Sequence, residues 1–437
     1  MKRKATLFLA MFMVLFSIVA CGPAANNPAV TESPSASGGA KESNTPEAKP
    51  QEKVTLRFVN YGAAKAELFG KIVDGFNSSQ SNIQVDFTTN TQNYFAQLKT
   101  QLSTGEAPDI FTHIIGMSMA PYVDAEHLMD ITNEPYMEKL QPSSLQGSTY
   151  KGKVYAIPLD AQTFGVYYNK DIFAKNGFEI PKTYSELVAL VDKMNAANIT
   201  PFAVNYREKW TLGQMATIAY SPLAIPEFEK KQDSFYKGDW TFDTANFNQL
   251  LNAVDLIVKN AQDRAIDTDL SGQYALFAEG KTAMMPTGNW AIPQIRKIAP
   301  DLNAGMFPMP VSENAAENKY AVDYALCLNV LADTKHPEAV REFITYFLDS
   351  KGATSFYYDS IGVPTALKES SDKLDSISES LAQAMKDGNT VRWFQTVLPQ
   401  GYDGEVWTSI QEYAASGSTD HKALIKKLDD TFIQMTK

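Results

Sequence analysis

The stretch from Ser271 to Trp290 places an aromatic side chain at a point where α/β proteins bind ligands. Ser271 is suited to cap a short helix that ends at Gly280, and residues 282–285 form an apolar run typical of a buried strand. Pro286 should stop this strand, so that Trp290 follows a tight turn at its carboxyl end. Open α/β sheets bind ligands at this edge. Trp290 is therefore either a ligand-binding surface or a buried core tryptophan.

Carboxylates are plentiful, but no arrangement of side chains predicts catalysis. Glycoside hydrolysis would need two facing carboxylates; Glu208 and Asp160 could supply them, yet nothing in the sequence pairs the two. The motifs of serine hydrolases, zinc proteases and phosphate-binding loops are absent. The remaining candidates are dispersed or lie in an apolar segment: His113, His127, His336, His421 and Cys327. We expect no catalytic residue, no metal site and no cofactor.

The amino terminus has the features of an export signal. Lys2, Arg3 and Lys4 precede an apolar run over residues 5–20 that is too short for a comfortable membrane span and ends at Cys21. Small residues before this cysteine resemble the lipobox of bacterial lipoproteins. We therefore predict a signal peptide over 1–20 and lipidation of Cys21, which would anchor the chain at the extracellular face of the cell membrane. The alternative is an ordinary signal peptide with an incidental cysteine.

Composition limits the remaining possibilities. Residues 21–53 are rich in Pro, Ser, Gly and Ala, which predicts a disordered tether after the lipidated cysteine. The chain has 437 residues and a formal net charge of −11, and no basic cluster remains once the signal is removed, so nucleic acid is excluded as a partner. Cys327 is the only other cysteine, which indicates a lone buried thiol without a disulfide.

Strands and helices alternate from Val54 onward, which predicts an α/β fold with mostly parallel strands. Thr183 and Glu186 form a capping-box pattern at the start of one helix. The expected strands are 54–60, 82–87, 153–158, 164–169, 282–285, 305–310 and 320–331, and the expected helices are 64–76, 94–102, 173–178, 181–195, 212–220, 247–259 and 336–348.

A set of motifs in one order closely resembles the family 1 extracellular solute-binding proteins, which are sugar-binding lipoproteins of ABC importers akin to maltose-binding protein. The resemblance covers nearly all of 54–437. Its motifs are Gly105-Glu106-Ala107-Pro108-Asp109-Ile110, Tyr155-Ala156-Ile157-Pro158, Tyr167-Tyr168-Asn169-Lys170-Asp171-Ile172-Phe173, Pro181-Lys182-Thr183-Tyr184-Ser185-Glu186-Leu187, Phe277-Ala278-Glu279-Gly280-Lys281-Thr282-Ala283-Met284 and Gly288-Asn289-Trp290.

The resemblance implies a two-lobed periplasmic-binding-protein fold of type II, in which a ligand cleft closes by hinge motion. The N-lobe would comprise 54–159 plus 311–360, and the C-lobe 160–310 plus 361–437. Hinges are expected near 159–160, 308–310 and 362–364. The closed form would be read by the permease subunits of an ABC transporter, and a monomer is expected.

The resemblance also carries over ligand-binding positions, because sugars need aromatic surfaces together with carboxylates and amides. Trp290 with Asn289, Trp210 with Glu208, and Trp393 match aromatic and polar positions of the C-lobe. The remaining candidates lie in the N-lobe or at crossovers: Asn60, Tyr61, His113, Asp160, Gln162 and Asp323. Relatives place an acidic residue near Gln162, so hydroxyl preference could differ here, and His113 could equally be structural.

The sequence therefore predicts a lipid-anchored protein that captures a mono- or oligosaccharide between two lobes and delivers it to a permease. Three alternatives stay open. One is a surface glycoside hydrolase, the second is a binding protein for a non-sugar polar solute, and the third is an adhesion or regulatory receptor on the same fold.

Overall fold

The computed structural model describes residues 53–369, 373–399 and 401–436. The predicted signal peptide, Cys21 and residues 21–52 of the predicted tether lie outside these ranges. Within them, no helix combines the length and the apolar character needed to cross a membrane.

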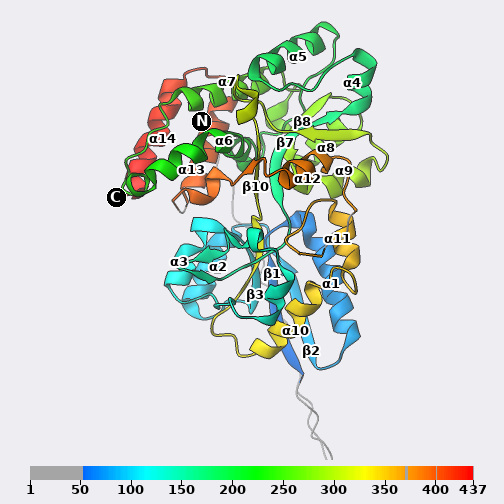
Figure 1. Ribbon diagram of the computed structural model, residues 1–437, viewed down its shortest axis with the longest axis vertical. Helices are drawn as coiled ribbons and strands as arrows, with labels where there is room; N and C mark the ends of the chain where they lie inside the picture. Colours follow the sequence, from blue (N-terminus) through cyan, green and yellow to red (C-terminus); the bar gives the residue numbers. More distant parts are fainter. Residues whose placement is uncertain (1–52, 370–372, 400, 437) are drawn as a thin grey trace, which may run out of the picture. The chain divides into compact units, whose positions relative to one another are not determined.

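Two sheets organise the described chain. The first has the strand order β2-β1-β3-β11-β6 and consists of β1 (Val54–Asn60), β2 (Ile83–Thr89), β3 (Ile110–Ile114), β6 (Ile157–Pro158) and β11 (Leu326–Val330). β1, β2 and β3 are parallel, whereas β11 is antiparallel to β3 and to β6. The helices beside this sheet are α1 (Ala66–Ser79), α2 (Tyr94–Thr104), α3 (Ala120–Asp124) and α10 (Pro337–Phe347) (Figure 1). A small hairpin joins β4 (Thr149–Tyr150) to β5 (Lys153–Val154).

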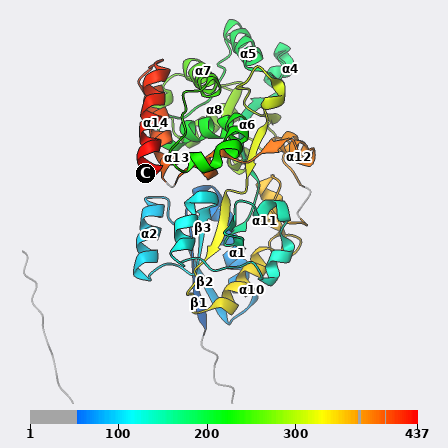
Figure 2. The ribbon, with the colours of Figure 1, turned by 60° about the vertical axis from the view of Figure 1, so that its left-hand side comes forward.

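The second sheet follows the order β12-β10-β7-β8, with β9 also paired to β7. Its strands are β7 (Gln162–Asn169), β8 (Met284–Gly288), β9 (Ala304–Phe307), β10 (Tyr320–Asp323) and β12 (Thr390–Val391). Around it lie α4 (Lys170–Asn176), α5 (Tyr184–Ala196), α6 (Lys209–Phe235), α7 (Ala245–Lys259), α8 (Leu270–Ala278), α9 (Ile292–Ile298), α12 (Glu379–Lys386), α13 (Tyr402–Ala415) and α14 (His421–Thr436), as Figures 1 and 2 show. α11 (Ser355–Ile361) contacts both α1 and α9.

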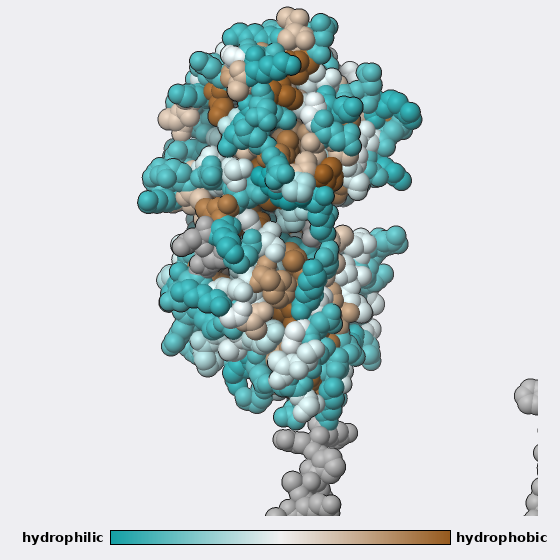
Figure 3. Space-filling model, turned by 90° about the vertical axis from the view of Figure 1, so that its right-hand side faces the viewer, coloured by the Kyte–Doolittle hydropathy of each residue, from teal (hydrophilic) through white to brown (hydrophobic). Residues whose placement is uncertain are grey.

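The apolar spacing of the sequence explains the packing of the first sheet. Leu56 and Phe58 alternate along β1 and are fully buried, while Phe69 and Phe76 lie on the buried face of α1. Phe58 contacts both Phe69 and Phe343 of α10, with ring centroids 5.9 Å apart in each pair. The carboxyl end of β1 points toward the second sheet (Figure 1). The face shown in Figure 3 is mostly hydrophilic, with hydrophobic side chains in separate patches.

The chain crosses between the sheets after β6 and again after β10, and it returns to the second sheet between α11 and α12. The crossing segments lie side by side and share backbone hydrogen bonds. Ala161 donates to Pro364 at 2.8 Å, Ala366 donates to Leu159 at 2.9 Å, and Leu159 donates to Leu326 at 3.2 Å. These bonds tie the crossing segments into one narrow connection.

One expected boundary is wrong. The sequence predicts residues 311–323 in the N-lobe, but β10 pairs with β7 of the second sheet, and Val311 and Ala321 are buried in the core of that sheet. The predicted single strand 320–331 is accordingly two strands in different sheets, β10 and β11. The crossing therefore lies at Tyr324 and Ala325 rather than near 308–310. An unbroken apolar pattern could not reveal this change of sheet.

The stretch before Trp290 differs in detail from the expectation. Asp269, not Ser271, caps α8, because its carboxylate accepts a hydrogen bond from Gly272 N at 2.9 Å. Gly280 has the predicted left-handed backbone, with φ of +68°. Pro286 lies inside β8 rather than ending it, which is possible because β8 is the last strand of the sheet and needs no further N–H donor there.

α6 and α13, which pack beside the second sheet, approach each other closely at Gly213 of α6. A Cβ atom at this position would lie 2.3 Å from the Cα atom of Trp407 on α13. Because the obstructing atom belongs to the backbone, the helices would have to separate to admit any side chain.

Gly213→Ala should therefore lower the free energy of unfolding by about 1–3 kcal/mol, the range for overpacked sites. Urea denaturation followed by circular dichroism measures the change. Gly70→Ala in α1 is the matched control, since a Cβ there meets nothing within 4 Å and alanine favours a helix. Equal stability of the two variants would contradict this account of the helix contact.

Candidate functional site

An apolar cavity of about 470 Å³ opens between elements of the two sheets. We call it the aromatic cavity after six of its lining residues: Tyr61, Phe95, Trp210, Tyr274, Trp290 and Trp407. The described residues that complete the lining are Asn60, Gly62, Ala63, Lys65, Thr91, Ile114, Gln162, Gln214, Leu270 and Leu326. Its walls thus come from both sheets, as in a site that two lobes share.

Trp290 and Trp210 form one wall of the aromatic cavity. Their ring centroids are 6.1 Å apart with planes inclined by 53°, and Phe164 supports Trp290 from 6.3 Å. Trp290 follows β8 directly, whereas Trp210 lies in the first turn of α6. A Cβ on Gly288 would lie 2.1 Å from the Trp290 ring, so the glycine lets the indole lie flat against the end of its own strand.

Tyr61 and Phe95 form part of the opposite wall, on the side of the first sheet. Their ring centroids lie 5.3 Å apart. Asn60 positions Tyr61 through the backbone: its amide donates to the Gly62 carbonyl at 2.6 Å and its Oδ1 accepts from the Thr112 hydroxyl at 3.1 Å. Burial raises the pKa of Tyr61, so its hydroxyl stays protonated at neutral pH.

Lys65 is the only charged residue among the described lining of the aromatic cavity. It forms a buried ion pair with Asp160, and the two residues are 6% and 2% exposed. The ammonium also lies 5.9 Å from the ring centroid of Tyr357. The carboxylate thus balances the lysine charge, and the cavity presents aromatic faces and amides rather than a net charge.

The structure brings five of the predicted site residues to the aromatic cavity: Asn60, Tyr61, Gln162, Trp210 and Trp290. Two other predicted residues, Asp160 and Asn289, bind the segment that crosses from β6 to β7 or its neighbours, outside the cavity lining. Asp160 holds Lys65, and Asn289 is 1% exposed, with its Oδ1 accepting from Thr163 N at 3.2 Å and its Nδ2 donating to the Ala161 carbonyl at 2.8 Å. Their side chains act on the shape of the site and are not part of its lining.

The prediction that Trp393 binds ligand is wrong for this structure. It is 1% exposed, packs in the core of the second sheet and donates its indole N–H to the Ala321 carbonyl at 3.0 Å. Glu208 is half-buried at the start of α6 and is absent from the lining, although its Oε2 is buried without a hydrogen-bond partner. Burial raises the pKa of Tyr274, and the charge of Glu208 adds to this shift.

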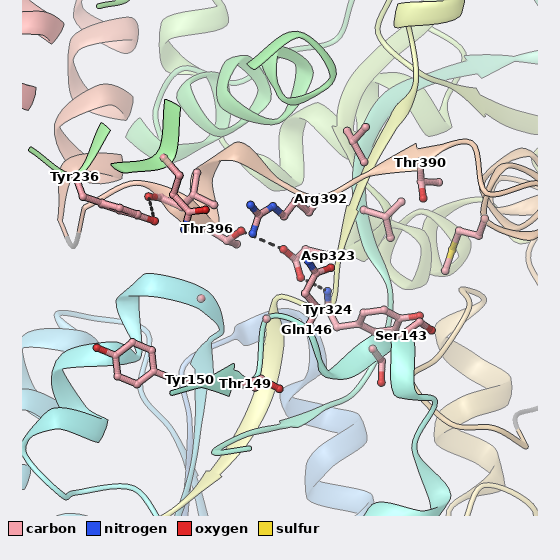
Figure 4. A pocket seen from close by; sticks show the side chains of 18 residues that line it. Ser143, Gln146, Thr149, Tyr150, Tyr236, Asp323, Tyr324, Thr390, Arg392 and Thr396 are labelled. Carbon is pink, nitrogen blue, oxygen red and sulfur yellow. Dashed lines mark hydrogen bonds between the residues drawn. The ribbon is translucent and has the colours of Figure 1, made fainter. Parts of the chain in front are cut away.

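Asp323 lies in a different, polar cavity of about 440 Å³, which shares no lining residue with the aromatic cavity (Figure 4). Burial raises the pKa of this carboxyl to about 6, and the Thr396 hydroxyl donates to it at 3.2 Å. Arg392 lines this cavity from the segment after α12, whereas Ser143 and Tyr150 line it from the segment before β4 and from β4 itself.

His113 lies in a third cavity of about 200 Å³ that we call the side cavity. Burial lowers the pKa of His113 to about 4, so the imidazole is neutral at pH 7. Its Nδ1–H donates to the Ile114 carbonyl at 2.7 Å. Among the described residues, no group of histidine, cysteine and carboxylate side chains could hold a metal ion.

Three lining aromatics escaped the sequence analysis: Phe95, Tyr274 and Trp407. A usable signal existed for Trp407, since it lies beside rather than within the buried stripe of α13 formed by Val406 and Ile410. A large aromatic residue beside such a stripe needs a partner other than the core.

The chain matches the family described as bacterial extracellular solute-binding protein over residues 71–387. A multiple sugar-binding protein of Streptococcus mutans is 28% identical over 333 residues, which cover 73% of this chain and 76% of that protein. The melibiose/raffinose/stachyose-binding protein of Bacillus subtilis is 22% identical over 368 residues, covering 80% and 83%.

Solved structures show the same fold. The solute-binding protein RafE in complex with raffinose superposes with a TM-score of 0.76 at 23% identity, covering 88% of this chain and all of that chain. RafE from Streptococcus pneumoniae without ligand gives a TM-score of 0.71 at 23% identity, covering 89% and 100%. The described chain thus has the two-lobed α/β architecture of these binding proteins.

The buried pair of Lys65 and Asp160 gives a prediction for stability. Asp160→Asn leaves the lysine ammonium buried without a counter-charge, which should lower the free energy of unfolding by about 3–5 kcal/mol. Equilibrium denaturation measures the loss.

Two further variants separate charge from packing. Lys71→Met removes an exposed pair with Glu67 and should change stability by less than about 1 kcal/mol. The double variant Lys65→Met/Asp160→Leu removes both charges and should recover most of the loss. If the double variant were no more stable than Asp160→Asn, an unpaired buried charge would not be the cause.

Proposed function

Because the chain belongs to the bacterial extracellular solute-binding proteins, we propose that it captures a neutral carbohydrate in the aromatic cavity and delivers it to an ABC importer. One observation carries the proposal. Trp210 and Trp290 line the aromatic cavity on the side of the second sheet, and Tyr61 lines it on the side of the first.

The chemistry of the cavity supports a sugar ligand. A pyranose ring has apolar C–H faces, which pack against aromatic rings, and a rim of hydroxyls, which need donors and acceptors together. Gln162 and Gln214 offer both from the lining. The names of the relatives agree with this chemistry, since they bind multiple sugars or melibiose, raffinose and stachyose.

The charge of the cavity favours neutral sugars over uronic acids or amino sugars. Lys65 is balanced by Asp160, so neither sign of ligand charge gains a free partner in the described lining. A charged ligand would lose its hydration without a compensating ion pair.

The geometry also favours binding over hydrolysis. A glycosidase needs two carboxylates that flank the scissile bond, at about 5–9.5 Å from each other. The described lining of the aromatic cavity contains no carboxylate, and Asp160 is engaged by Lys65 behind it. The proposed activity is therefore capture and release of an unmodified sugar.

Cys21 completes the proposal. The lipobox-like sequence before it and the Pro- and Ser-rich residues 21–53 favour a protein tethered by lipid at the extracellular face of the membrane, close to the permease subunits. In this proposal the tether lets the folded part reach the permease in either lobe arrangement.

Titration of the purified protein with neutral mono- and oligosaccharides should give a saturable change in tryptophan fluorescence and a raised melting temperature for one sugar class. The same sugar should be recovered intact after hours of incubation. Trp290→Ala should weaken its binding by tenfold or more, because one stacking face is lost.

Trp240→Phe is the control, since Trp240 is a core tryptophan outside the aromatic cavity and is 7% exposed. Its sugar affinity should equal that of the parent protein. Binding of amino acids or peptides instead of sugars would contradict the proposed ligand class, and breakdown of the sugar would restore the glycosidase alternative.

Replacement of Cys21 tests the anchor separately. In bacteria that express the full chain, Cys21→Ser should move the protein from the membrane fraction to the soluble extracellular or periplasmic fraction, because the acyl chains supply the membrane affinity. Sugar affinity should be unchanged. Retention of the variant in the membrane fraction would argue against lipidation at this cysteine.

A further inference from the structure

The side cavity adjoins the aromatic cavity, and the two share Phe95 and Ile114 in their linings. The other residues of the side cavity are His113, Ile115, Ser118, Tyr122, Gln395, Thr396, Leu398, Pro399, Gly401 and Asp403. Like the aromatic cavity, it is walled by both sheets: β3 and α3 on one side and the segment before α13 on the other.

Rings continue from one cavity into the other along the first sheet. Phe95 lies 5.3 Å from Tyr61 and 5.0 Å from His113, and His113 lies 5.2 Å from Tyr122, each measured between ring centroids. His113 belongs to this series as an uncharged ring, because burial lowers its pKa to about 4. A continuous apolar surface thus joins the two compartments.

The opposite wall is continuous as well. Asp403 lines the side cavity and Trp407 lines the aromatic cavity, and the two are one turn apart on α13. Side chains four residues apart share one face of a helix. The same helix face therefore spans both compartments.

Gln395 brings an unpaired hydrogen-bond acceptor to the side cavity. The residue is 6% exposed, and its Oε1 is buried without a hydrogen-bond partner. A buried unpaired acceptor costs about 1–3 kcal/mol, and a donor that arrives with a ligand would recover this loss. Asp403 adds a second acceptor, and burial raises the pKa of its carboxyl.

We propose that the ligand is an oligosaccharide of at least two units, with one unit in the aromatic cavity and the next in the side cavity, where Gln395 and Asp403 accept its hydroxyls. This inference rests on the proposed function and adds the length of the ligand and the residues that read its second unit. The second unit packs against Phe95 and His113, in the way that the first packs against the tryptophans.

Calorimetric titration of the purified full chain with two series tests the proposal: galactose, melibiose, raffinose and stachyose, and glucose, maltose and maltotriose. Within the series that binds, the disaccharide should bind at least tenfold more tightly than its monosaccharide. Gln395→Met keeps the size of the side chain and removes the acceptor. It should weaken binding of the disaccharide and of longer sugars by tenfold or more while changing monosaccharide affinity less than twofold.

Gln383→Met is the matched control, since Gln383 lies on α12 and lines neither cavity. It should leave every affinity unchanged. Asp403→Asn provides a second probe, which keeps the shape and should reduce only the affinity for the longer sugars. Melting temperatures of all variants without sugar establish that each is folded.

The outcomes are distinct. Equal affinities for mono- and oligosaccharides, or equal losses for both in Gln395→Met, would overturn the second subsite and leave sugar binding intact. Failure of every sugar in both series to bind, with binding of a non-sugar solute, would overturn the proposed function and this inference together. A loss confined to the longer sugars supports both.

Discussion

The arrangement of the whole molecule depends on a narrow connection between its two sheets. The crossing after β6 shares backbone hydrogen bonds with residues 364–366 and with β11, and the buried pair of Lys65 and Asp160 fastens the start of α1 to it. These hydrogen bonds and this ion pair lie at one place, where the two sheets, each packed with its own helices, meet. Lys65 also lines the aromatic cavity, so the connection and the cavity share this residue. In the proposed function, a ligand in the cavity would therefore lie beside the connection between the lobes.

The two sheets and their helices contribute different aromatic residues to the cavity. The second sheet supplies the tryptophans, held by the end of β8, the start of α6 and the middle of α13, and the first supplies Tyr61 and Phe95. Neither wall alone encloses the cavity. Amides and a balanced lysine complete a lining suited to an uncharged, hydroxyl-rich molecule. The family and the printed names of its sugar-binding relatives agree with this chemistry.

Much of the fold was predictable because local patterns determined it. The alternation along β1, the apolar face of α1 and the glycine after α8 follow rules that act over a few residues. The ordered motifs predict Trp290 and Trp210 as site residues, and both line the aromatic cavity. The errors have a different origin. Whether Trp393 faces a cleft or a core, whether residues 320–331 stay in one sheet, and whether Trp407 meets a ligand depend on contacts between distant segments. Asn289 and Asp160 are predicted as ligand-binding residues, but their side chains bind other parts of the protein at the first crossing and do not line the aromatic cavity.

The glycine before Trp290 has a thermodynamic consequence. With the indole lying against the backbone of Gly288 and flanked by Trp210 and Phe164, few rotamers are open to it in the absence of ligand. The conformational entropy of this side chain is therefore lost when the protein folds and not when a ligand arrives. In the proposed site, a preorganised ring of this kind would leave the enthalpy of ligand packing largely uncompensated, and it would restrict the sugar to orientations that match one fixed plane. In this proposal, tight and selective binding would both follow from the absence of a Cβ atom at Gly288.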